Sequence, residues 1–318
     1  MGPTMIVDAF SAAPALLILA LGMYTTVVRD TFSATVGFLA YGLLLTVAWV
    51  QLHGVDVALT EAAIGGGLTA LLLVRASARL RTTETQALAD APGLPLRLLA
   101  GLGAAAVAGA LAVALLSLPD PAPTLAPEAA ANIASTGVGN PITAVLMAYR
   151  AMDTLLEAIV LLLALIGVWS LAPDRVWGGR PGPRYNADPD GILAFIARVV
   201  PPIGIIVGMY IFWVGADQPG GKFQGATILA AMWLLTLMAG LTDAPPISRR
   251  LLRVLLVAGP MVFIAVGVAG VPLAGAFLAY PEGWAKPMIL VIEFALMPSL
   301  ALTLGLVMAG TPERAAEP

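Results

Sequence analysis

The chain alternates long apolar stretches with short polar segments along its 318 residues. A helix that crosses a lipid bilayer requires about 20 consecutive, mostly apolar residues, and these stretches have that length. The pattern therefore predicts an all-α polytopic membrane protein with nine transmembrane helices. The predicted spans are residues 11–28, 33–52, 55–74, 97–117, 153–172, 192–214, 223–242, 251–272 and 287–309.

Composition supports a membrane protein and excludes several kinds of chemistry. Hydrophobic residues make up 59% of the chain and charged residues only 11%, with a mean hydropathy of +0.93. A soluble domain carries about 25% charged residues. The sequence has no cysteine and one histidine, His53, which excludes disulfides, thiolate metal sites and thiol nucleophiles. His53 has no evident serine and aspartate partners, so an intramembrane enzyme is disfavoured.

The distribution of basic residues predicts the orientation. Cytoplasmic loops of membrane proteins carry an excess of Lys and Arg. With nine spans and the N-terminus outside, thirteen of the sixteen Lys and Arg residues fall on the cytoplasmic side, where the C-terminus also lies; Arg150, Lys222 and Lys286 remain outside. The first span follows no basic segment, so we expect it to be retained and not cleaved as a signal.

Two polar segments divide the predicted spans into blocks of three, two and four. These are residues 80–96 and residues 173–191, the second rich in Arg, Gly, Pro and Asp, as is typical of linkers. In the predicted outer loop 118–140 we expect no regular structure beyond a short helix.

Five carboxylates fall within the predicted spans: Asp56, Glu61, Asp153, Glu157 and Glu293. A carboxylate in hydrocarbon costs roughly 2.5–3.5 kcal/mol on insertion scales, and such residues usually mark ion pathways. Asp153 and Glu157 are four residues apart and share one face of a helix. Glu293 lies deep in the last predicted span and requires a partner or a water-filled cavity. Alternatively, Asp56 and Asp153 lie in water at span ends, as charges that favour a helix N-terminus.

Asp56 and Glu61 are five residues apart, so in an ideal α-helix they point in different directions. A π-bulge between Asp56 and Gly67 would bring them nearly into line, and the glycine run tolerates one; its members are Gly65, Gly66 and Gly67. Thr60 lies one turn after Asp56 and adds a hydroxyl oxygen. A transient Na⁺ at Asp56, Thr60 and Glu61 is one interpretation.

A glycine-rich motif joins the sixth and seventh predicted spans. It comprises Pro219, Gly220, Gly221, Lys222, Phe223, Gln224 and Gly225. Pro and Gly are typical of a tight turn, and the glycine spacing also permits close backbone approach to a neighbour or an ion. No Ser or Thr follows Lys222, so the motif is not a phosphate-binding loop.

These motifs resemble a known family. Residues 56–65 (DVALTEAAIG) resemble the D subunit of membrane-bound hydrogenases and the C-terminal part of the A subunit of Mrp-type multisubunit Na⁺/H⁺ antiporters. Residues 140–144 (NPITA) and 149–157 (YRAMDTLLE) are similar to the E subunit of the same hydrogenases. Residues 192–310, which contain PGGKFQG at 219–225, resemble the Mrp B subunit.

The resemblance implies a natural fusion of three modules. Residues 1–90 would be a D-like module of three spans and residues 91–175 an E-like module of two. Residues 176–189 would be a cytoplasmic linker, and residues 190–310 a B-like module of four spans. The first part would be similar to the J subunit of respiratory complex I, including its π-bulged third helix.

The resemblance also implies a role. The chain would be a non-catalytic ion-path and scaffold subunit of an Mrp-like complex in a bacterial inner membrane, without a cofactor and without nucleic acid. Its partners would be large antiporter-like subunits, a small protein similar to the K subunit of complex I, lipids, Na⁺ and H⁺. Glu61 and Glu157 would alternate in protonation, with Asp56, Asp153 and Thr60 as a gate or rim; Glu293 matches an acidic position only loosely.

The sequence departs from the family pattern at two places. His53-Gly54-Val55 precedes Asp56 where Gly-Ala-Pro is commoner, and Lys222 stands where the B subunit usually has Gly. A lysine at 222 would tune or block a cation entrance. No lysine falls in a predicted span interior, so the chain lacks the lysine signature of the larger proton-pumping subunits.

Two other functions remain open from the sequence. The same membrane module could serve a redox-driven hydrogenase or complex I-like assembly, or an inorganic-carbon uptake complex. Alternatively, the chain could be a purely structural membrane spacer whose carboxylates pair with neighbouring subunits and never titrate.

Overall fold

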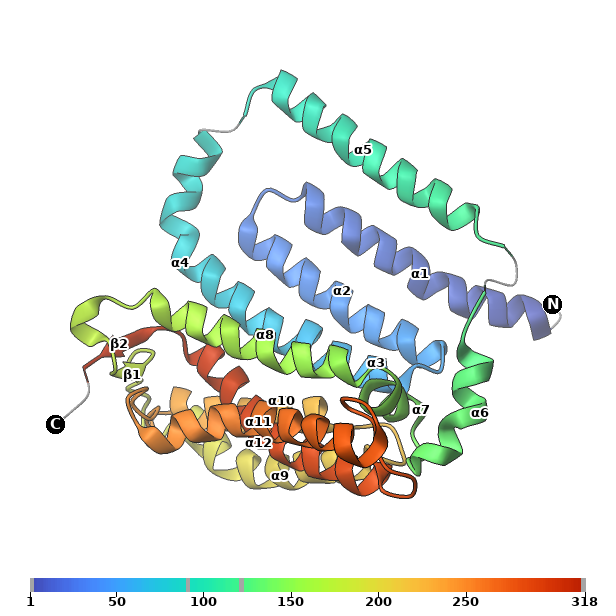
Figure 1. The fold of residues 1–318 in the computed structure, drawn as a ribbon. Coiled ribbons are helices and arrows are strands. Elements are labelled where there is room, and N and C mark those ends of the chain that lie inside the picture. The colour runs from blue at the N-terminus through green and yellow to red at the C-terminus, as the bar shows by residue number, and fades with distance from the viewer. Residues whose placement is uncertain (1–2, 90–91, 120–122, 316–318) are drawn as a thin grey trace.

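The computed structural model describes residues 3–89, 92–119 and 123–315. The expected boundary between the first two modules, at residues 90 and 91, lies outside these described residues. Long helices dominate this part of the chain, and the N- and C-termini lie at opposite ends of the helix bundle (Figure 1). Opposite ends are what an odd number of membrane crossings requires.

The N-terminal part forms three antiparallel rods. They are α1 (Pro3–Val27), α2 (Thr31–Gln51) and a continuous rod made of α3 (Val55–Thr60), the π-helix η1 (Glu61–Thr69) and α4 (Ala70–Ala89). Asp30 caps α2 by accepting a hydrogen bond from the Ser33 amide at 2.7 Å, which satisfies one of the free N–H groups at the helix start. A π-helix is therefore present in the segment where the sequence predicted a bulge.

Helix α5 (Leu94–Leu116) stands apart from the rest of the chain (Figure 1). All of its side chains are exposed. A helix that is apolar on every side requires an apolar environment on every side. Lipid or another protein must therefore cover it.

The chain then returns through two short helices to a long one. Helix α6 (Ala126–Thr136) occupies part of the predicted outer loop, followed by α7 (Pro141–Ala144), the π-helix η2 (Val145–Tyr149) and α8 (Ala151–Ser170). Arg150, with φ −130° and ψ 37°, makes the turn between η2 and α8. The chain thus re-enters the helix bundle at residue 141, ahead of the predicted fifth span.

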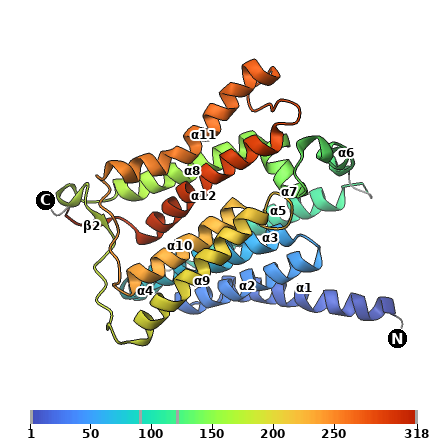
Figure 2. The same cartoon turned by 90° about the horizontal axis from the view of Figure 1, so that it is seen from below.

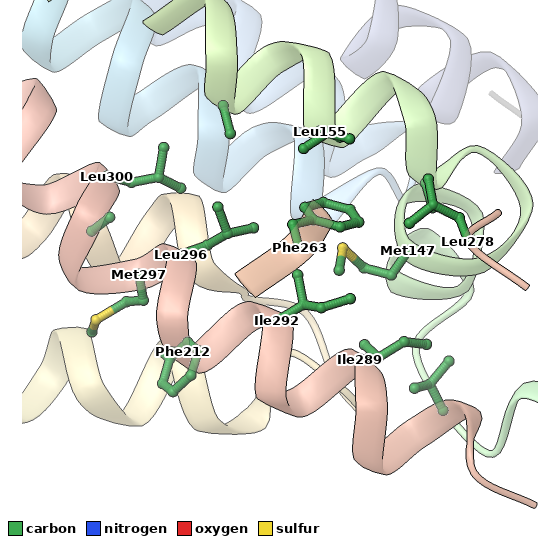
Figure 3. Close-up of a cluster of buried hydrophobic side chains, with 14 of the residues drawn as sticks. Met147, Leu155, Phe212, Phe263, Leu278, Ile289, Ile292, Leu296, Met297 and Leu300 are labelled. Carbon is green, nitrogen blue, oxygen red and sulfur yellow. The ribbon is translucent and has the colours of Figure 1, made fainter. Parts of the chain in front are cut away.

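The C-terminal part contributes four long helices, α9 (Ile192–Val214), α10 (Lys222–Met238), α11 (Arg250–Ala274) and α12 (Ala285–Ala309). Figure 2 shows α12 between α8 and α10, with α11 beside it. Most of the α12 side chains are buried. Figure 3 shows the core of this region, where Ile292 and Leu296 of α12 meet Phe263 of α11 and Leu155 of α8.

Glycines allow α9 and α10 to pack closely. A methyl group added at Gly225 of α10 would lie 2.8 Å from the carbonyl oxygen of Gly208 on α9. Small residues at such crossings let helix backbones approach in a membrane, where van der Waals contact drives association. Gly225 of the glycine-rich motif therefore has a packing role.

The linker is tied to the C-terminal end of the chain. It contains the 3₁₀ turn η3 (Asp174–Val176) and β1 (Arg180–Pro181), which pairs antiparallel with β2 (Pro312–Arg314). The amide of Ile247 donates to the Gly179 carbonyl at 2.9 Å. The segment that the sequence suggests as a linker is thus folded against neighbouring segments.

The helices confirm an all-α polytopic membrane protein. Among the described residues, seven helices are long and apolar enough to cross a membrane, and two shorter apolar ones are Ala12–Val27 and Lys222–Met238. Helix α10 ends at Met238, four residues before the predicted end of the seventh span. Nine crossings therefore remain a prediction.

Because the chain has no native cysteine, single cysteines can test the predicted orientation. Ser135 on α6 and Ser248 before α11 are both exposed, at opposite ends of the bundle. In spheroplasts, a membrane-impermeant maleimide should label Ser135→Cys at once and Ser248→Cys only after the membrane is opened. Equal labelling of both in intact spheroplasts would show that the orientation is wrong.

Candidate functional site

A cavity of about 270 Å³ lies where the three parts of the chain meet. Its walls come from α3 and η1, from α7 and η2, from α8, from the α9–α10 loop with the start of α10, and from α12. Among the lining residues are the polar side chains of Asp56, Thr60, Glu157, Lys222, Gln224 and Glu293, together with Thr143. The cavity thus gathers most of the ionisable residues predicted within spans.

Asp56 is buried and held by neutral donors. Only 9% of the residue is exposed, although it stands in the first turn of α3. Its Oδ1 accepts hydrogen bonds from the Gly220 amide at 3.0 Å and from Asn140 Nδ2 at 3.1 Å. The alternative that Asp56 lies in water at a span end is therefore wrong in this structure.

The two adjacent glycines explain how the α9–α10 loop reaches Asp56. Gly220 and Gly221 have φ of 147° and 146°, a region that side chains disfavour. A methyl group at Gly220 would collide with the Ile211 carbonyl oxygen, which accepts a hydrogen bond from the Gly221 amide at 3.1 Å. Glycine at 220 therefore lets the backbone N–H point at Asp56, whereas Pro219 is exposed.

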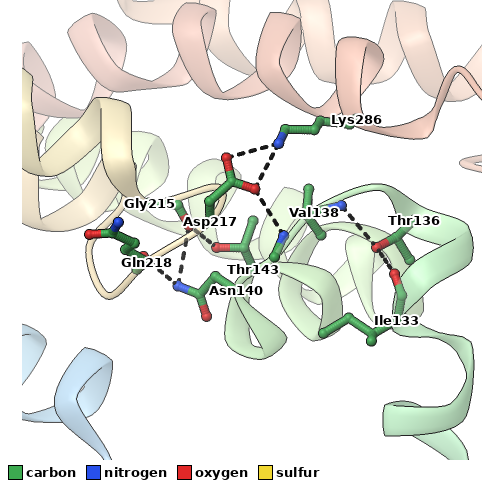
Figure 4. A network of polar contacts seen from close by, with 10 residues as sticks. Ile133, Thr136, Val138, Asn140, Thr143, Gly215, Asp217, Gln218 and Lys286 are labelled. Atoms are coloured by element: carbon green, nitrogen blue, oxygen red, sulfur yellow. Dashed lines mark hydrogen bonds and ion pairs between the residues drawn. The ribbon is translucent and has the colours of Figure 1, made fainter.

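Asn140 is the residue that sequence reasoning missed. Its Oδ1 caps α7 by accepting from the Ile142 amide, and its Nδ2 lies within hydrogen-bond distance of Asp56. The same Nδ2 lies within hydrogen-bond distance of the carbonyls of Gly215 and Gln218 (Figure 4). Asn followed by Pro is a typical helix start, and that signal could have identified the cap. The contacts to Asp56 and to the α9–α10 loop depend on tertiary structure.

An ion pair fixes the outer side of the same loop. Lys286 Nζ lies 2.7 and 2.8 Å from the two carboxylate oxygens of Asp217, and the Gly139 amide donates to the same group (Figure 4). The hydrogen bond from Lys286 holds the pKa of Asp217 below its usual range. The pair therefore stabilises the loop at neutral pH, and this contribution is lost as the pH falls through the lowered pKa.

Lys222 and Glu293 form a buried ion pair across the cavity. Lys222 Nζ lies 3.2 Å from Glu293 Oε1 and 3.3 Å from Met147 Sδ, and both charged residues are at most 3% exposed. The ammonium also stands 5.6 Å from the ring centre of Phe223. Lys222, which the sequence places in the loop before the seventh predicted span, is the first residue of α10, and its side chain is buried.

Thr60 is held in place by two hydrogen bonds. Its hydroxyl donates to the Asp56 carbonyl at 2.9 Å and accepts from Gln224 Nε2 at 3.0 Å. Gln224 therefore connects the start of α10 with α3, and the Thr60 oxygen already has a donor.

The two carboxylates of α8 have different environments. Glu157 lines the cavity from its α8 side and interacts electrostatically with Lys222. Asp153 instead pairs with Arg150 at 2.5 Å, and the two side chains are 51% and 70% exposed. Asp153 does not line the cavity, so sharing a helix face with Glu157 does not bring both into one site.

Glu61 lies beside the cavity without lining it. The π-helix begins at Glu61, so the spacing from Asp56 to Glu61 remains that of an α-helix and the two carboxylates are not aligned. A methyl group added at Gly65 would lie 2.8 Å from Glu61 Cδ, and one at Gly42 of α2 would lie 3.4 Å from Glu61 Oε1. Glu61 therefore occupies the space between α2 and η1 that Gly65 leaves free.

Asp56, Thr60 and Glu61 thus do not converge on one point. In the described parts of the chain, no three acidic or histidine side chains form a group that could hold a metal ion. Gly66 and Gly67, the other members of the glycine run, lie in η1 outside the cavity wall.

Comparisons with known proteins agree with this arrangement. Residues 192–311 match the model of a domain related to the MnhB subunit of Na⁺/H⁺ antiporters. Residues 16–82 match the model of MbhD, the D subunit of MBH. The chain belongs to the Mrp-type antiporter family. It is a fusion in which an MbhD-like part precedes an MnhB-like part.

Solved structures support the same fold. In the Mrp complex from a Dietzia species, one chain superposes with a TM-score of 0.70 over 96% of this chain, at 22% identity, and this chain spans 35% of it. A chain of the archaeal membrane-bound sulfane sulfur reductase superposes with a TM-score of 0.56 and is 25% identical. That match covers 68% of this chain and 98% of the archaeal one.

The match to one curated protein covers less of the chain. An uncharacterized protein of Methanocaldococcus jannaschii is 25% identical over 156 residues, which is 44% of this chain. The match spans 60% of the length of that relative.

The contacts of Asn140 predict a loss of stability when its amide is removed. Asn140→Ala leaves the buried Asp56 and two loop carbonyls without that donor, and an unsatisfied buried group costs about 1–3 kcal/mol. The melting temperature of the purified complex should fall. Asn132→Ala on exposed α6 is the matched control, because among the described residues the Asn132 side-chain amide donates only to the Glu128 carbonyl. Equal melting of both variants would contradict this role.

A side chain added at Gly65 is expected to clash with Glu61. Gly65→Ala places a methyl group against Glu61, and overpacking costs about 1–3 kcal/mol. The melting temperature of the complex should fall. Gly103→Ala on α5, where an added methyl meets nothing within 4 Å, should leave it unchanged or raise it, since Ala favours helix over Gly. A harmless Gly65→Ala would show that Glu61 is free to move.

Proposed function

We propose that the chain is a non-catalytic ion-path and scaffold subunit of an Mrp-like multisubunit cation and proton antiporter complex. The cavity is part of the pathway through which the ion passes. One observation carries the proposal: charged groups from three separate parts of the chain line the same cavity. Asp56 comes from the MbhD-like part, Glu157 from α8, and Lys222 with Glu293 from the MnhB-like part.

The cavity residues have different roles because their surroundings differ. Asp56 accepts two hydrogen bonds, which hold its side chain in the cavity wall. Glu157 is the titrating member, because within the described residues its carboxylate makes no hydrogen bond or salt bridge. Burial favours the protonated form of a carboxyl group, and a nearby positive charge such as Lys222 favours the ionised form.

Two further carboxylates extend the path beyond the cavity. Asp153 lies one turn before Glu157, toward the start of α8, and is the proposed gate at the outer end of the ion path. Glu61, in the space beside Gly65, is the proposed proton-binding site next to α2. In this scheme, protonation alternates between Glu61 and Glu157, and Thr60 orients the wall between them.

Partner subunits cover the exposed apolar helices. Helix α5 contributes no buried residue, and the large side chains of α1, such as Leu19 and Met23, are about 70% exposed. The proposed occupants are large antiporter-like subunits and a small protein similar to the K subunit of complex I, with lipid around them. The basic residues place the linker side in the cytoplasm, and a bacterial inner membrane is the proposed location.

A second function uses the same membrane module with another source of energy. The structural match to an archaeal sulfane sulfur reductase chain favours a redox-driven assembly over a purely structural spacer. Co-purification of an iron–sulfur protein with this chain would identify that alternative.

The proposed function predicts that Glu157→Gln blocks transport without preventing assembly. The complex containing the variant would be reconstituted in vesicles, and cation-dependent proton movement would be followed with a pH-sensitive dye. Transport should fall to near background, since glutamine cannot bind and release a proton. Asp56→Asn, which keeps the hydrogen bonds but removes the fixed charge, should also reduce it.

The matched control is Glu282→Gln in the exposed outer loop between α11 and α12. It makes the same chemical change away from the cavity and should transport normally. Wild-type transport by Glu157→Gln and Asp56→Asn would overturn the proposed function. Failure of both to assemble, with normal Glu282→Gln, would instead support a structural spacer.

A further inference from the structure

Lys222 and Glu293 have the lowest side-chain exposure of the ion pairs between described residues, at 4% and 3%. A positive side chain in an otherwise acidic cavity requires an explanation. Isolated charges are expensive to bury, so a buried lysine persists where it compensates an anion. Here the anion is Glu293, on the helix that forms the centre of the bundle.

Two other oxygen atoms at the cavity already accept hydrogen bonds. Asp56 Oδ1 accepts from Gly220 and Asn140, and the Thr60 hydroxyl accepts from Gln224. Hard cations such as Ca²⁺ and Mg²⁺ require several oxygen ligands arranged around them, and Na⁺ has the same preference for oxygen. The carboxylate of Glu293 is such a ligand, and the Lys222 ammonium stands against it.

We propose that Lys222 is a tethered cation that sets the ion specificity of the cavity. Its ammonium occupies the position beside Glu293 that a mobile metal ion would take, so Na⁺ does not bind at Glu293. The inference deepens the proposed function and rests on it, since it names the ion that this chain handles.

Charge and size explain why the two ions are treated differently. A Na⁺ ion at Glu293 would meet the like charge of Lys222 at close range, where repulsion in a dry site is strong. A proton that binds a carboxylate oxygen of Glu157 forms an O–H bond and requires no ligand shell. The O–H bond that forms on Glu157 is matched by the one that breaks on the preceding donor, so Lys222 keeps its charge throughout.

The test measures Na⁺ binding instead of transport. Equilibrium binding of radioactive ²²Na⁺ would be measured on the purified complex containing the full chain. The part of the binding that depends on Glu293 is isolated by comparison with Glu293→Gln. In the wild-type background this part should be zero. Lys222→Met, which keeps the length of the side chain without its charge, should bind one extra Na⁺ per chain.

Two further variants complete the design. Lys222→Met/Glu293→Gln should lose the extra Na⁺, which locates it at Glu293. Lys222→Arg keeps the positive charge and should remain without it. If Lys222→Met does not assemble, the double variant, in which both groups are neutral, is compared with the wild type and should bind the same amount of Na⁺.

The proposal is overturned if Glu293→Gln or the double variant binds less Na⁺ than the wild type. It is also overturned if Lys222→Met assembles and gains no Na⁺. Failure of the proposed function would instead appear as normal proton transport by Glu157→Gln, and the two results are therefore distinguishable.

Discussion

The structure depends on how charges are stabilised inside an apolar helix bundle. A buried carboxylate must receive hydrogen bonds or an opposite charge, or it will bind a proton. The two buried acidic groups of this cavity meet the requirement differently. Asp56 is satisfied by an amide N–H and an asparagine side chain, and Glu293 by a lysine. Glu157 lines the cavity from α8 but is exposed, so the requirement does not apply to it.

These solutions also hold the modules together. The hydrogen bonds of Asn140 and Gly220 to Asp56 join segments that are 84 and 164 residues apart in the sequence. The Lys222–Glu293 pair joins α10 to α12 at the same place. Removing one partner of a buried ion pair costs about 3–5 kcal/mol, because the other charge is left uncompensated. The groups proposed to handle the ion are therefore also groups that set the relative positions of the helices.

Much of the fold could be predicted from the sequence, because apolar length and basic-residue distribution are direct physical requirements of a membrane. The π-helix could be placed as well, since Asp56, Glu61 and the glycine run signal an irregular helix. The alignment expected from it was wrong. The π-helix starts at Glu61, so it changes the direction of the residues that follow and leaves the angle between Asp56 and Glu61 unaltered.

The pairings in the cavity could not be predicted, because they depend on which helices are neighbours. A single sequence places Lys222 next to a turn, and turns are normally solvated. Burial of Lys222 follows from a loop that folds inward, which its two positive-φ glycines permit. Glu293 has no counterpart within its own helix, so its partner had to come from another element.

The charge of Lys222 affects the carboxylates of the cavity, although the residue stands at the start of a helix. If residue 222 had no charged side chain, Glu293 would stand buried beside Asp56 and Glu157 with no cation to compensate it. Such a cavity would have to bind a metal ion or several protons to remain stable. With Lys222 in place, its ammonium group compensates the charge of Glu293. Asp56 is stabilised by the neutral donors of Asn140 and Gly220. In the proposed scheme, Glu157 is then the cavity carboxylate that binds and releases the proton, and Lys222 prevents a mobile cation from binding at Glu293.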